Sequence, residues 1–314
     1  MSLRGQDIVS VSQLSRIDIE RLFALAERCL PIARGEATSH ALRGRILANL
    51  FFEPSTRTRL SFGSAFMRLG GSVESTVGVQ FSSMVKGETL EDTIRVIDGY
   101  ADIIVLRHPE EGSALRAARV AEHPIINGGD GPGEHPTQAL LDLFTIARER
   151  GSVEGVRIAL VGDLRYGRTV HSLARLLARF NGVSVVLSSP ASLALPEPLL
   201  SELIASGLNL RTAPSLEEAL ADADVAYVTR IQAERFEHPA EAARLIGSYV
   251  VNLELLERIG RTDLTILHPL PRYNDLSPDV DHLPGAAYFR QSHYGVPVRM
   301  ALFCDVLGAI PEEH

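Results

Sequence analysis

The sequence predicts an α/β protein built from two doubly wound parallel-sheet domains that are joined by crossing helices. The chain has 314 residues, more than the ~250–300 residues at which a single hydrophobic core usually stops growing. Short apolar runs alternate with amphipathic stretches along its length, a pattern typical of parallel strands with helices on both faces. With 45% hydrophobic and 22% charged residues, the composition is that of a globular protein with substantial cores.

Seven apolar runs are predicted to be buried strands because each is short and nearly uninterrupted. In chain order they cover residues 45–52, 102–108, 123–127, 157–163, 183–189, 224–230 and 264–270. Helix-compatible spacing follows in residues 61–69 and 91–100, and the clearest amphipathic helix covers residues 137–150. The tail, residues 293–310, is predicted to be a last helix.

The amphipathic helix marks the predicted domain boundary, because a GSVEG turn and a new strand follow it. The first domain is expected to span residues 1–135 and to be completed by the C-terminal helix, residues 293–314. The interdomain helix covers residues 136–150, and the second domain covers residues 151–292.

Charge and cysteine content exclude several classes of function. The 31 Lys and Arg against 39 Asp and Glu give a net charge of -8, which argues against an extended nucleic-acid surface. No run approaches the ~18–20 apolar residues that span a membrane, and the N-terminus has no secretory pattern. The only cysteines, Cys29 and Cys304, are too few for a disulfide framework and lack zinc spacing. We therefore expect a cytoplasmic protein with no metal.

The first segment with chemical potential is Glu53-Pro-Ser-Thr-Arg-Thr-Arg59, between a predicted strand and a predicted helix. Amide groups at a helix start, hydroxyls and an arginine can together form a cradle for an anion. The segment lacks GxxxxGK[ST], so it is not a nucleotide P-loop. The alternative is that Ser55 and Thr56 only cap the helix while the arginines are solvated.

Further polar residues follow other predicted strands. Arg107 ends the strand at residues 102–108, and His135 with Gln138 opens the amphipathic helix at a spacing that could serve one small ligand. A lone histidine is more often structural than catalytic. The HPLPR segment, residues 268–272, has two prolines that suit a rigid or cis-bonded loop able to present carbonyl groups.

The second domain contributes Arg168, in GDLRYGR, and Arg230 with Gln232, in TRIQ. Because guanidinium groups bind carboxylates in a bidentate manner, two arginines from neighbouring strand ends suit a dicarboxylate. The alternative is that both form ordinary surface salt bridges. GDLRYGR lacks GxGxxG, so a nicotinamide cofactor is not favoured. Ser82 and Lys86 lie in a polar loop, QFSSMVKGETLEDT, whose plain interpretation is a solvated tip.

Seven segments in order carry a resemblance to a known family: FFEPSTRTRLSF, SSMVKGETLEDT, VLRHPEEG, HPTQALLDLFTI, GDLRYGRTVHSL, TRIQAER and HPLPR. From about residue 5 to 310 the chain resembles the aspartate/ornithine transcarbamoylase family. STRTR and HPxQ are shared across that family, whereas HPLPR, Arg168 and the Arg230 and Gln232 pair are similar to its aspartate type. The resemblance implies transfer of a carbamoyl group from carbamoyl phosphate to L-aspartate, giving N-carbamoyl-L-aspartate and phosphate in pyrimidine biosynthesis.

The resemblance also implies a role for each matching residue. The phosphate would be bound by Ser55, Thr56, Arg57, Thr58 and Arg107. The carbamoyl carbonyl would be surrounded by Arg57, Thr58 and His135, and the carbamoyl NH₂ recognised by Gln138, Leu270 and Pro271. The carboxylates of aspartate would be held by Arg168, Arg230 and Gln232.

In this family a neighbouring subunit supplies Ser82 and Lys86, so the resemblance implies a homotrimer with shared active sites. The arginines and Lys86 would neutralise and orient two anionic substrates, and Arg57, Thr58, Arg107 and His135 would stabilise the oxyanion. No cofactor is implied, and a regulatory chain or a dihydroorotase partner is compatible with the resemblance. The alternatives are another acceptor, such as ornithine, and a non-catalytic scaffold.

Overall fold

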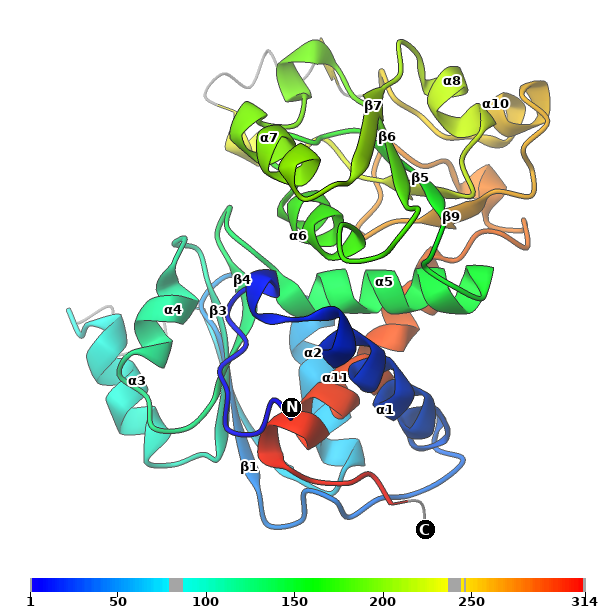
Figure 1. Ribbon diagram of the computed structural model, residues 1–314. Coiled ribbons are helices and arrows are strands. Elements are labelled where there is room, and N and C mark those ends of the chain that lie inside the picture. The colour runs from blue at the N-terminus through cyan, green and yellow to red at the C-terminus, as the bar shows by residue number, and fades with distance from the viewer. Residues whose placement is uncertain (1, 79–86, 237–243, 246, 313–314) are drawn as a thin grey trace. The chain divides into compact units, whose positions relative to one another are not determined.

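The computed structural model describes residues 2–78, 87–236, 244–245 and 247–312 (Figure 1). The chain divides into two compact units, Met1–Leu140 with His293–His314 and Leu141–Ser292. The division falls inside two helices, α5 (Pro136–Arg150) and α11 (Tyr288–Leu307), so each helix contributes to both units. Each unit has a parallel sheet with helices around it, and the predicted fold class is confirmed.

The first unit contains a four-stranded parallel sheet in the order β2-β1-β3-β4. Its strands are β1 (Ile46–Phe51), β2 (Ser72–Val77), β3 (Ile103–His108) and β4 (Ile125–Asp130). The central strands β1 and β3 pair with each other. In the chain β1 is followed by β2, which lies on its outer side, and β3 is followed by β4, which lies on the opposite outer side. The strand order therefore reverses between β1 and β3, and loops at the carboxyl ends of such strands form the usual ligand site of an open α/β sheet.

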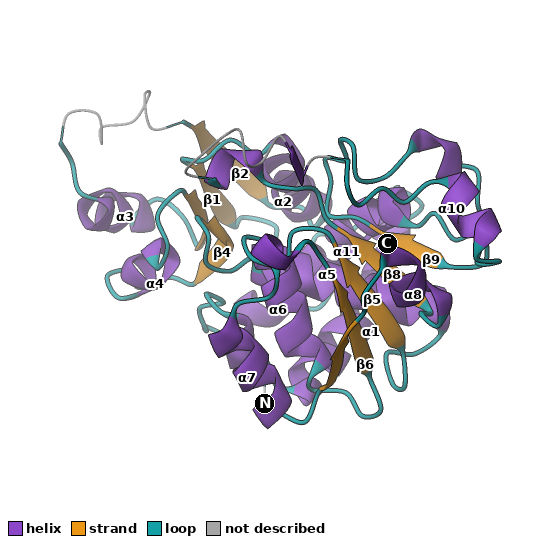
Figure 2. Cartoon of the chain, turned by 90° about the horizontal axis from the view of Figure 1, so that it is seen from above, coloured by secondary structure: helices purple, strands orange, loops and turns teal. Residues whose placement is uncertain are grey.

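Helices cover both faces of this sheet (Figures 1 and 2). One face carries α3 (Leu90–Asp98) and α4 (Ser113–Ala118), and Ile94 and Ala117 pack there on Leu50 and Leu106. The other face carries α2 (Thr56–Arg68) and α11, with α1 (Arg16–Arg34) packed against α2. The Phe303 ring meets Phe66 edge-on at 5.0 Å between centroids. A short 3-10 helix, Val11–Gln13, precedes α1.

The second unit contains a five-stranded parallel sheet in the order β7-β6-β5-β8-β9. Its strands are β5 (Arg157–Val161), β6 (Ser184–Ser188), β7 (Asn209–Thr212), β8 (Val225–Val228) and β9 (Thr265–Leu267). The order reverses between β5 and β8, which pair directly. The second unit therefore offers its own ligand site at the carboxyl ends of these two strands.

The two faces of the second sheet are also covered by helices. Figures 1 and 2 show α6 (Arg168–Leu177) and α7 (Glu197–Ala205) on one face and α8 (Leu216–Ala221) and α10 (Leu253–Arg258) on the other. Successive side chains of a strand point to opposite faces of the sheet. On one face, Ala159 and Ala226 pack in the cluster that contains Leu220 and Leu256. Short 3-10 helices cover Ala191–Leu193, Ala233–Arg235 and Pro278–Val280.

Two strands, β2 and β7, were not predicted from the sequence. Both are edge strands, and most of their residues are exposed or only half-buried. Because an edge strand with a wet face needs no apolar run, its place is set by backbone pairing with the neighbouring strand. The predicted helix at residues 61–69 also begins earlier in the structure, at Thr56, so the STRTR segment itself opens α2. Similarly, α11 begins at Tyr288 rather than at residue 293.

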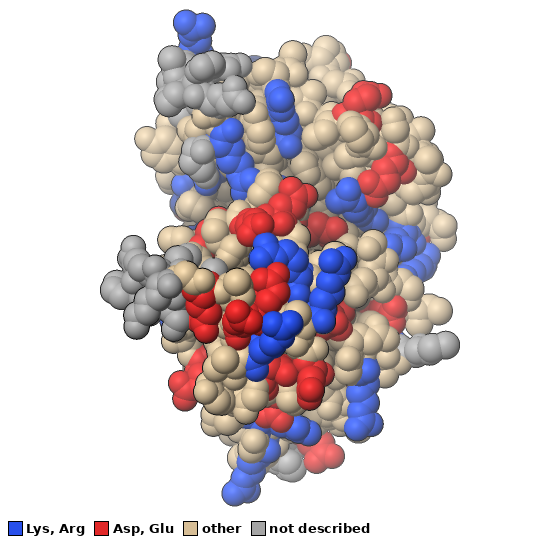
Figure 3. Space-filling view, turned by 90° about the vertical axis from the view of Figure 1, so that its left-hand side faces the viewer, with Lys and Arg blue, Asp and Glu red and all other residues tan. Residues whose placement is uncertain are grey.

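Several further properties bear on function. Among the described residues, no helix combines the length and apolar character that crossing a membrane requires. Cys29 and Cys304 are free and buried. Within the same described ranges, no group of three or more His, Cys, Asp or Glu is placed to hold a metal ion. On the face drawn in Figure 3, Lys and Arg side chains are interspersed with Asp and Glu.

The ion pair between α3 and α4 allows a test by pH. Arg116 Nε lies 2.7 Å from Glu91 Oε1, and this contact lowers the pKa of Glu91 from 4.5 to about 2. Because the folded pKa lies below the unfolded one, the pair stabilises the fold above the unfolded pKa, and this contribution is lost as pH falls through the folded one. Urea unfolding should therefore show that the stability deficit of Arg116→Ala shrinks between pH 6 and pH 3.5 (values chosen to bracket ~4.3, the ordinary glutamate pKa).

The exposed Arg119, the C-cap residue of the same short helix, provides the control. Arg119→Ala should show the same stability difference from wild type at both pH values. A deficit of Arg116→Ala that does not change with pH would contradict the assigned pairing.

Candidate active site

The segment after β1 opens α2 with groups suited to an anion. Ser55 is the N-cap residue and has an extended backbone. Within the described residues, no amide at the start of α2 donates to its hydroxyl, whereas Ser15 and Thr89 cap their own helices in that way. The Ser55 hydroxyl is therefore not used for capping, contrary to the plain alternative. The amide groups and the dipole of a 13-residue helix add positive potential at the same point.

The next residues of this segment differ in exposure. Thr56 and Arg57 are exposed, while Thr58 is buried at 9% exposure. Loss of part of its hydration lowers the pKa of Arg57, but a guanidinium still remains charged near neutral pH. Arg57 thus places a cation beside the helix start, in reach of solvent and of a solute.

Arg107 ends β3 next to this segment, because β1 and β3 pair and Phe51 lies opposite Arg107. It is 8% exposed, and its Nη1 donates to the Gly128 carbonyl at 3.1 Å. Its Nη2 lies 3.0 Å from Glu53 Oε2. The carboxylate of Glu53 thereby orients the guanidinium and reduces its desolvation cost. Glu53 was assigned no role from the sequence, although it stands only two residues before Ser55 in the predicted anion-binding segment.

His135 comes directly before α5 rather than on its face, and Gln138 lies in the first turn. His135 is 4% exposed. Its backbone carbonyl accepts a hydrogen bond from the backbone amide of Gln138 at 3.0 Å. The preceding loop is anchored at both ends: Asp130 accepts the Glu134 amide at 2.8 Å, and Glu134 accepts the Val11 amide at 2.8 Å. These contacts keep His135 near the carboxyl ends of β3 and β4.

A third arginine of the first unit was not predicted from the sequence. Arg299, on α11, is 3% exposed and lies over the Phe62 ring at 4.5 Å. Its Nη1 donates to Ser61 Oγ at 2.7 Å and its Nη2 to Thr137 Oγ1 at 3.4 Å. Arg299 thus ties the helices α2 and α5 that follow Ser55 and His135. No local signal revealed it, because it stands in an apolar helix pattern.

In the second unit, Arg168 is the first residue of α6 and is 9% exposed. Arg230 and Gln232 follow β8 and are half-buried. Since β5 and β8 are adjacent, the structure brings the Arg168 loop and the Arg230 loop to one edge of the sheet. Two guanidinium groups and an amide at this edge can bind carboxylates.

Asp163 joins these two loops. It was not among the site residues predicted from the sequence. Its carboxylate accepts the Tyr166 amide at 2.9 Å and the Gln232 amide at 3.1 Å. The residue is fully buried, and burial raises the pKa of Asp163. It therefore acts as a shared acceptor that fixes the backbone on both sides of the edge.

The same edge requires a glycine. At Gly162, where φ is +105°, an added Cβ would lie 2.1 Å from the Thr229 carbonyl oxygen. The Thr229 hydroxyl in turn donates to the Val161 carbonyl at 3.0 Å. The ends of β5 and β8 therefore approach more closely than any side chain at position 162 would allow.

The HPLPR loop follows β9 and contains a cis peptide bond between Leu270 and Pro271. Leu270 is half-buried and Pro271 is exposed. The Leu270 amide donates to Nδ1 of His268 at 2.8 Å. The remaining predicted site residues, Ser82 and Lys86, lie outside the described residues.

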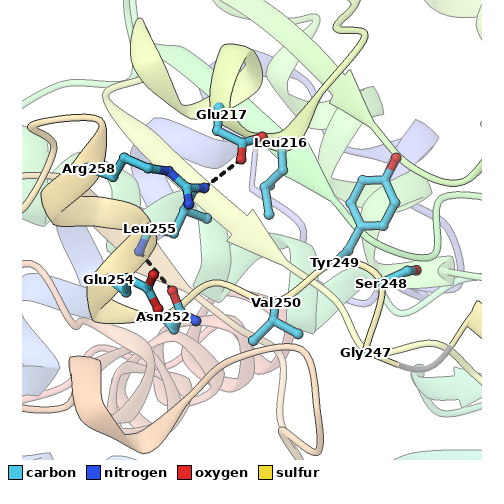
Figure 4. Close-up of a pocket in the computed structure, with 10 residues that line it drawn as sticks. All are labelled: Leu216, Glu217, Gly247, Ser248, Tyr249, Val250, Asn252, Glu254, Leu255 and Arg258. Atoms are coloured by element: carbon cyan, nitrogen blue, oxygen red, sulfur yellow. Dashed lines mark hydrogen bonds and ion pairs between the residues drawn. The ribbon is translucent and has the colours of Figure 1, made fainter.

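A hollow of about 370 Å³ on the second unit lies apart from these residues (Figure 4). Arg258 and Glu217 point toward each other across it and form an ion pair at 2.7 Å. The Asn252 side chain caps α10 by accepting the Leu255 amide at 2.9 Å. Three polar side chains of this hollow are thus engaged within it, and none of the predicted site residues lines it.

Comparison with known proteins adds to this geometry. Residues 6–148 match the family model described as aspartate/ornithine carbamoyltransferase, carbamoyl-P binding domain. Residues 154–306 match the corresponding Asp/Orn binding domain. The chain belongs to the aspartate/ornithine carbamoyltransferase family.

Within this carbamoyltransferase family, the chain is similar to curated relatives over its whole length. It is 49% identical over 310 residues to the aspartate carbamoyltransferase catalytic subunit of Methanococcoides burtonii, covering 99% of this chain and 100% of that protein. It is 51% identical over 307 residues to the subunit of the same name from Methanopyrus kandleri, covering 98% and 99%.

Solved structures of family members are similar as well. The catalytic subunit of M. jannaschii aspartate transcarbamoylase has a TM-score of 0.90 and 47% identity, covering 96% of this chain and 98% of that one. Aspartate transcarbamoylase from Trypanosoma cruzi, in complex with carbamoyl phosphate and aspartate, has a TM-score of 0.91 and 44% identity, covering 97% and 98%.

The shared acceptor at Asp163 can be tested by hydrogen exchange. In Asp163→Ala two backbone N–H groups lose their acceptor, so amide exchange in residues 164–168 and 230–233 should become at least ~10-fold faster. Asp163→Asn, which keeps one acceptor oxygen, should show a smaller change. Asp222→Ala removes an exposed aspartate from the same unit and serves as the control. Unchanged protection in Asp163→Ala would show that this carboxylate does not hold the two loops.

Proposed function

We propose that the chain is the catalytic chain of an aspartate carbamoyltransferase, which converts carbamoyl phosphate and L-aspartate into N-carbamoyl-L-aspartate and phosphate. The observation that carries this proposal is the pair of arginines, Arg168 and Arg230, at the strand-order reversal of the second unit. About half of all residues are identical to those of catalytic subunits of that name, which supports aspartate rather than ornithine as the acceptor.

Carbamoyl phosphate is assigned mainly to residues of the first unit. Its phosphate is bound at the start of α2 and by the end of β3, through Ser55, Thr56, Arg57, Thr58 and Arg107. The carbonyl oxygen accepts hydrogen bonds from Arg57, Thr58 and His135. The NH₂ group is recognised by Gln138 and by the carbonyl groups of Leu270 and Pro271. The exposure of Arg57 and the fixed guanidinium of Arg107 support this assignment.

L-Aspartate is assigned to the second unit. Arg168 and Arg230 bind its two carboxylates, and Gln232 adds an amide hydrogen bond. Asp163 supports this role because it holds both loops in one arrangement before a substrate arrives. Lys86, with Ser82, comes from a neighbouring subunit and neutralises the remaining charge of the two anions.

The reaction is a direct acyl transfer. The amine nitrogen of aspartate forms a bond to the carbamoyl carbon, the carbonyl oxygen becomes an oxyanion, and the bond from carbon to the phosphate oxygen then breaks. The amine loses one proton, which the departing phosphate is able to accept. Arg57, Thr58, Arg107 and His135 stabilise the oxyanion, and loss of one such donor commonly costs ~10²–10³ in rate. The step balances without an oxidant, a reductant or a covalent enzyme intermediate.

The assembly is proposed to be a homotrimer in the cytoplasm, serving pyrimidine biosynthesis. Exposed apolar side chains on α2 and β2 support a contact with another copy of the chain. Leu60 and Met67, on α2, are 53% and 57% exposed, and Val77, at the end of the edge strand β2, is 43% exposed. Burial of these side chains would be favourable, and Ser82 and Lys86 come after β2 in the sequence.

Acceptor choice can be tested by a colorimetric assay of carbamoylated product. Wild-type chain should form carbamoyl-aspartate and no citrulline from ornithine. Arg168→Ala removes a charge-assisted bond, so the KM for aspartate should rise ~10–100-fold while the KM for carbamoyl phosphate changes less than ~3-fold. Arg165→Ala, at an exposed arginine of the same loop, is the control. An unaltered aspartate KM in Arg168→Ala would contradict the role of Arg168.

Shared active sites can be tested by mixing two inactive variants. An Arg57→Ala chain and a Lys86→Ala chain should each lose at least ~10²-fold in rate. Mixed trimers contain sites in which Arg57 of one chain meets Lys86 of another, so activity should return after dissociation and reassembly. Separately reassembled single variants are the control. If no mixture regains activity, each chain carries a complete site.

A further inference from the structure

A continuous network of hydrogen bonds lies inside the second unit, linking five residues that none of the assigned roles uses through their side chains and one backbone amide. It runs from β8 through α5 and α11 to the loop after β9. Its members are 0 to 6% exposed: Tyr227, Asp142, Gln291, His268 and Asp275.

The end of this network at β9 clamps the HPLPR loop. The Leu270 amide donates to His268 Nδ1 at 2.8 Å, so Nδ1 carries no proton and the ring proton is on Nε2. Nε2 then donates to Asp275 Oδ2 at 2.5 Å. The other oxygen of Asp275 accepts the Tyr273 amide at 3.0 Å. One histidine and one carboxylate therefore hold the backbone amides on both sides of Pro271.

This clamp acts on a backbone conformation that needs support. Leu270 has φ of +55°, in the left-handed region, which is unfavourable for a residue with a Cβ. A hydrogen bond to its amide can offset this cost. Without His268 the loop would gain by relaxing toward negative φ, and the carbonyl group of Leu270 would turn with it.

The opposite end of the network fixes the histidine. The His268 amide donates to Gln291 Oε1 at 2.8 Å, and Gln291 Nε2 donates to Asp142 Oδ1 at 2.6 Å. The Tyr227 hydroxyl donates to Asp142 Oδ2 at 2.7 Å. Burial raises the pKa of Tyr227 well above its ordinary value, so its hydroxyl keeps the proton that it donates.

The Tyr227 end reaches the elements that carry the proposed aspartate residues. Tyr227 lies on β8, three residues before Arg230. Its hydroxyl is also hydrogen-bonded to the side chain of Thr169, which follows Arg168 on α6. Polar groups buried in a core stabilise it less than well-packed apolar ones would, whereas a fully bonded network specifies one arrangement. The network thus suits a positioning role better than a purely stabilising one.

We propose that this hydrogen-bonded network, through His268 and Asp275, positions the carbonyl group of Leu270 so that the enzyme distinguishes carbamoyl phosphate from inorganic phosphate. The inference rests on the proposed function, because it deepens the recognition of the carbamoyl NH₂ group. His268 and Asp275 are positioning residues that act through the backbone. The two ligands share the phosphate, and only carbamoyl phosphate has an NH₂ group for Leu270 to accept from.

The test compares the two ligands in calorimetric titrations of the full chain. In Asp275→Asn the amide of position 275 cannot accept from both His268 and Tyr273. The Kd for carbamoyl phosphate should rise about tenfold, while the Kd for inorganic phosphate changes less than ~2-fold. Asp279→Asn, at an exposed aspartate of the same segment, should alter neither. A purely structural role would weaken both ligands equally or neither, and either result overturns the proposal.

A second pair of variants keeps the test sharp if Asp275→Asn folds poorly. The Asn oxygen in His268→Asn can stand in for Nδ1 and accept from Leu270, whereas His268→Leu fills the space without an acceptor. The asparagine variant should retain a carbamoyl phosphate Kd within ~3-fold of wild type, and the leucine variant should lose about tenfold. Equal losses in the two variants would overturn the positioning role.

The wild-type chain separates this proposal from the proposed function. If wild-type chain does not prefer carbamoyl phosphate over inorganic phosphate, the proposed function fails, and the positioning role fails with it. If wild-type chain has that preference and Asp275→Asn keeps it unchanged, the positioning role alone is wrong.

Discussion

The reversal of strand order inside each parallel sheet is the constraint on which the rest of this structure depends. Between β1 and β3, and again between β5 and β8, neighbouring strands send their chains to opposite sides, so their carboxyl ends are left uncovered by a crossing helix. The first reversal brings Ser55 together with Arg107, and the second brings Arg168 together with Arg230. A protein with a net charge of -8 thereby concentrates cations at the two edges where the proposed substrates would bind. The acidity is left to other parts of the surface.

Carboxylates that are wholly or partly buried do much of the positioning in both units. Glu53 orients the guanidinium of Arg107, Asp163 accepts two loop amides, and Asp142 links two helices and a strand. Each carboxylate loses hydration on burial, and this cost is recovered only where its oxygens are bonded with good geometry. The hydrogen bonds that meet this requirement also fix the loops before any substrate binds, which lowers the entropy lost on binding.

Much of the fold and part of the candidate site could be predicted from local sequence. Buried strands such as β3 and β5 leave an apolar run, and the STRTR, HPTQ and GDLRYGR segments carry residue types whose chemistry is readable in place. The edge strand β2 left no such run, because it is held by pairing with β1. Asp163 was missed because, although one of its partners lies 3 residues away, the other lies 69 residues away in the chain. Glu53 was missed because its partner lies 54 residues away. The partners of Arg299 lie 162 and 238 residues away.

The sequence by itself determined the family, the α/β class and the residue types available for binding anions, because these depend on composition, periodicity and short motifs. Only the tertiary structure decided which of these residues meet at one sheet edge and which backbone groups are held still. The left-handed conformation of Leu270 illustrates the difference. It depends on His268 and Asp275, whose own orientation depends on Gln291 and Asp142 from distant helices. Such a conformation is set by contacts between elements, and no local propensity favours it.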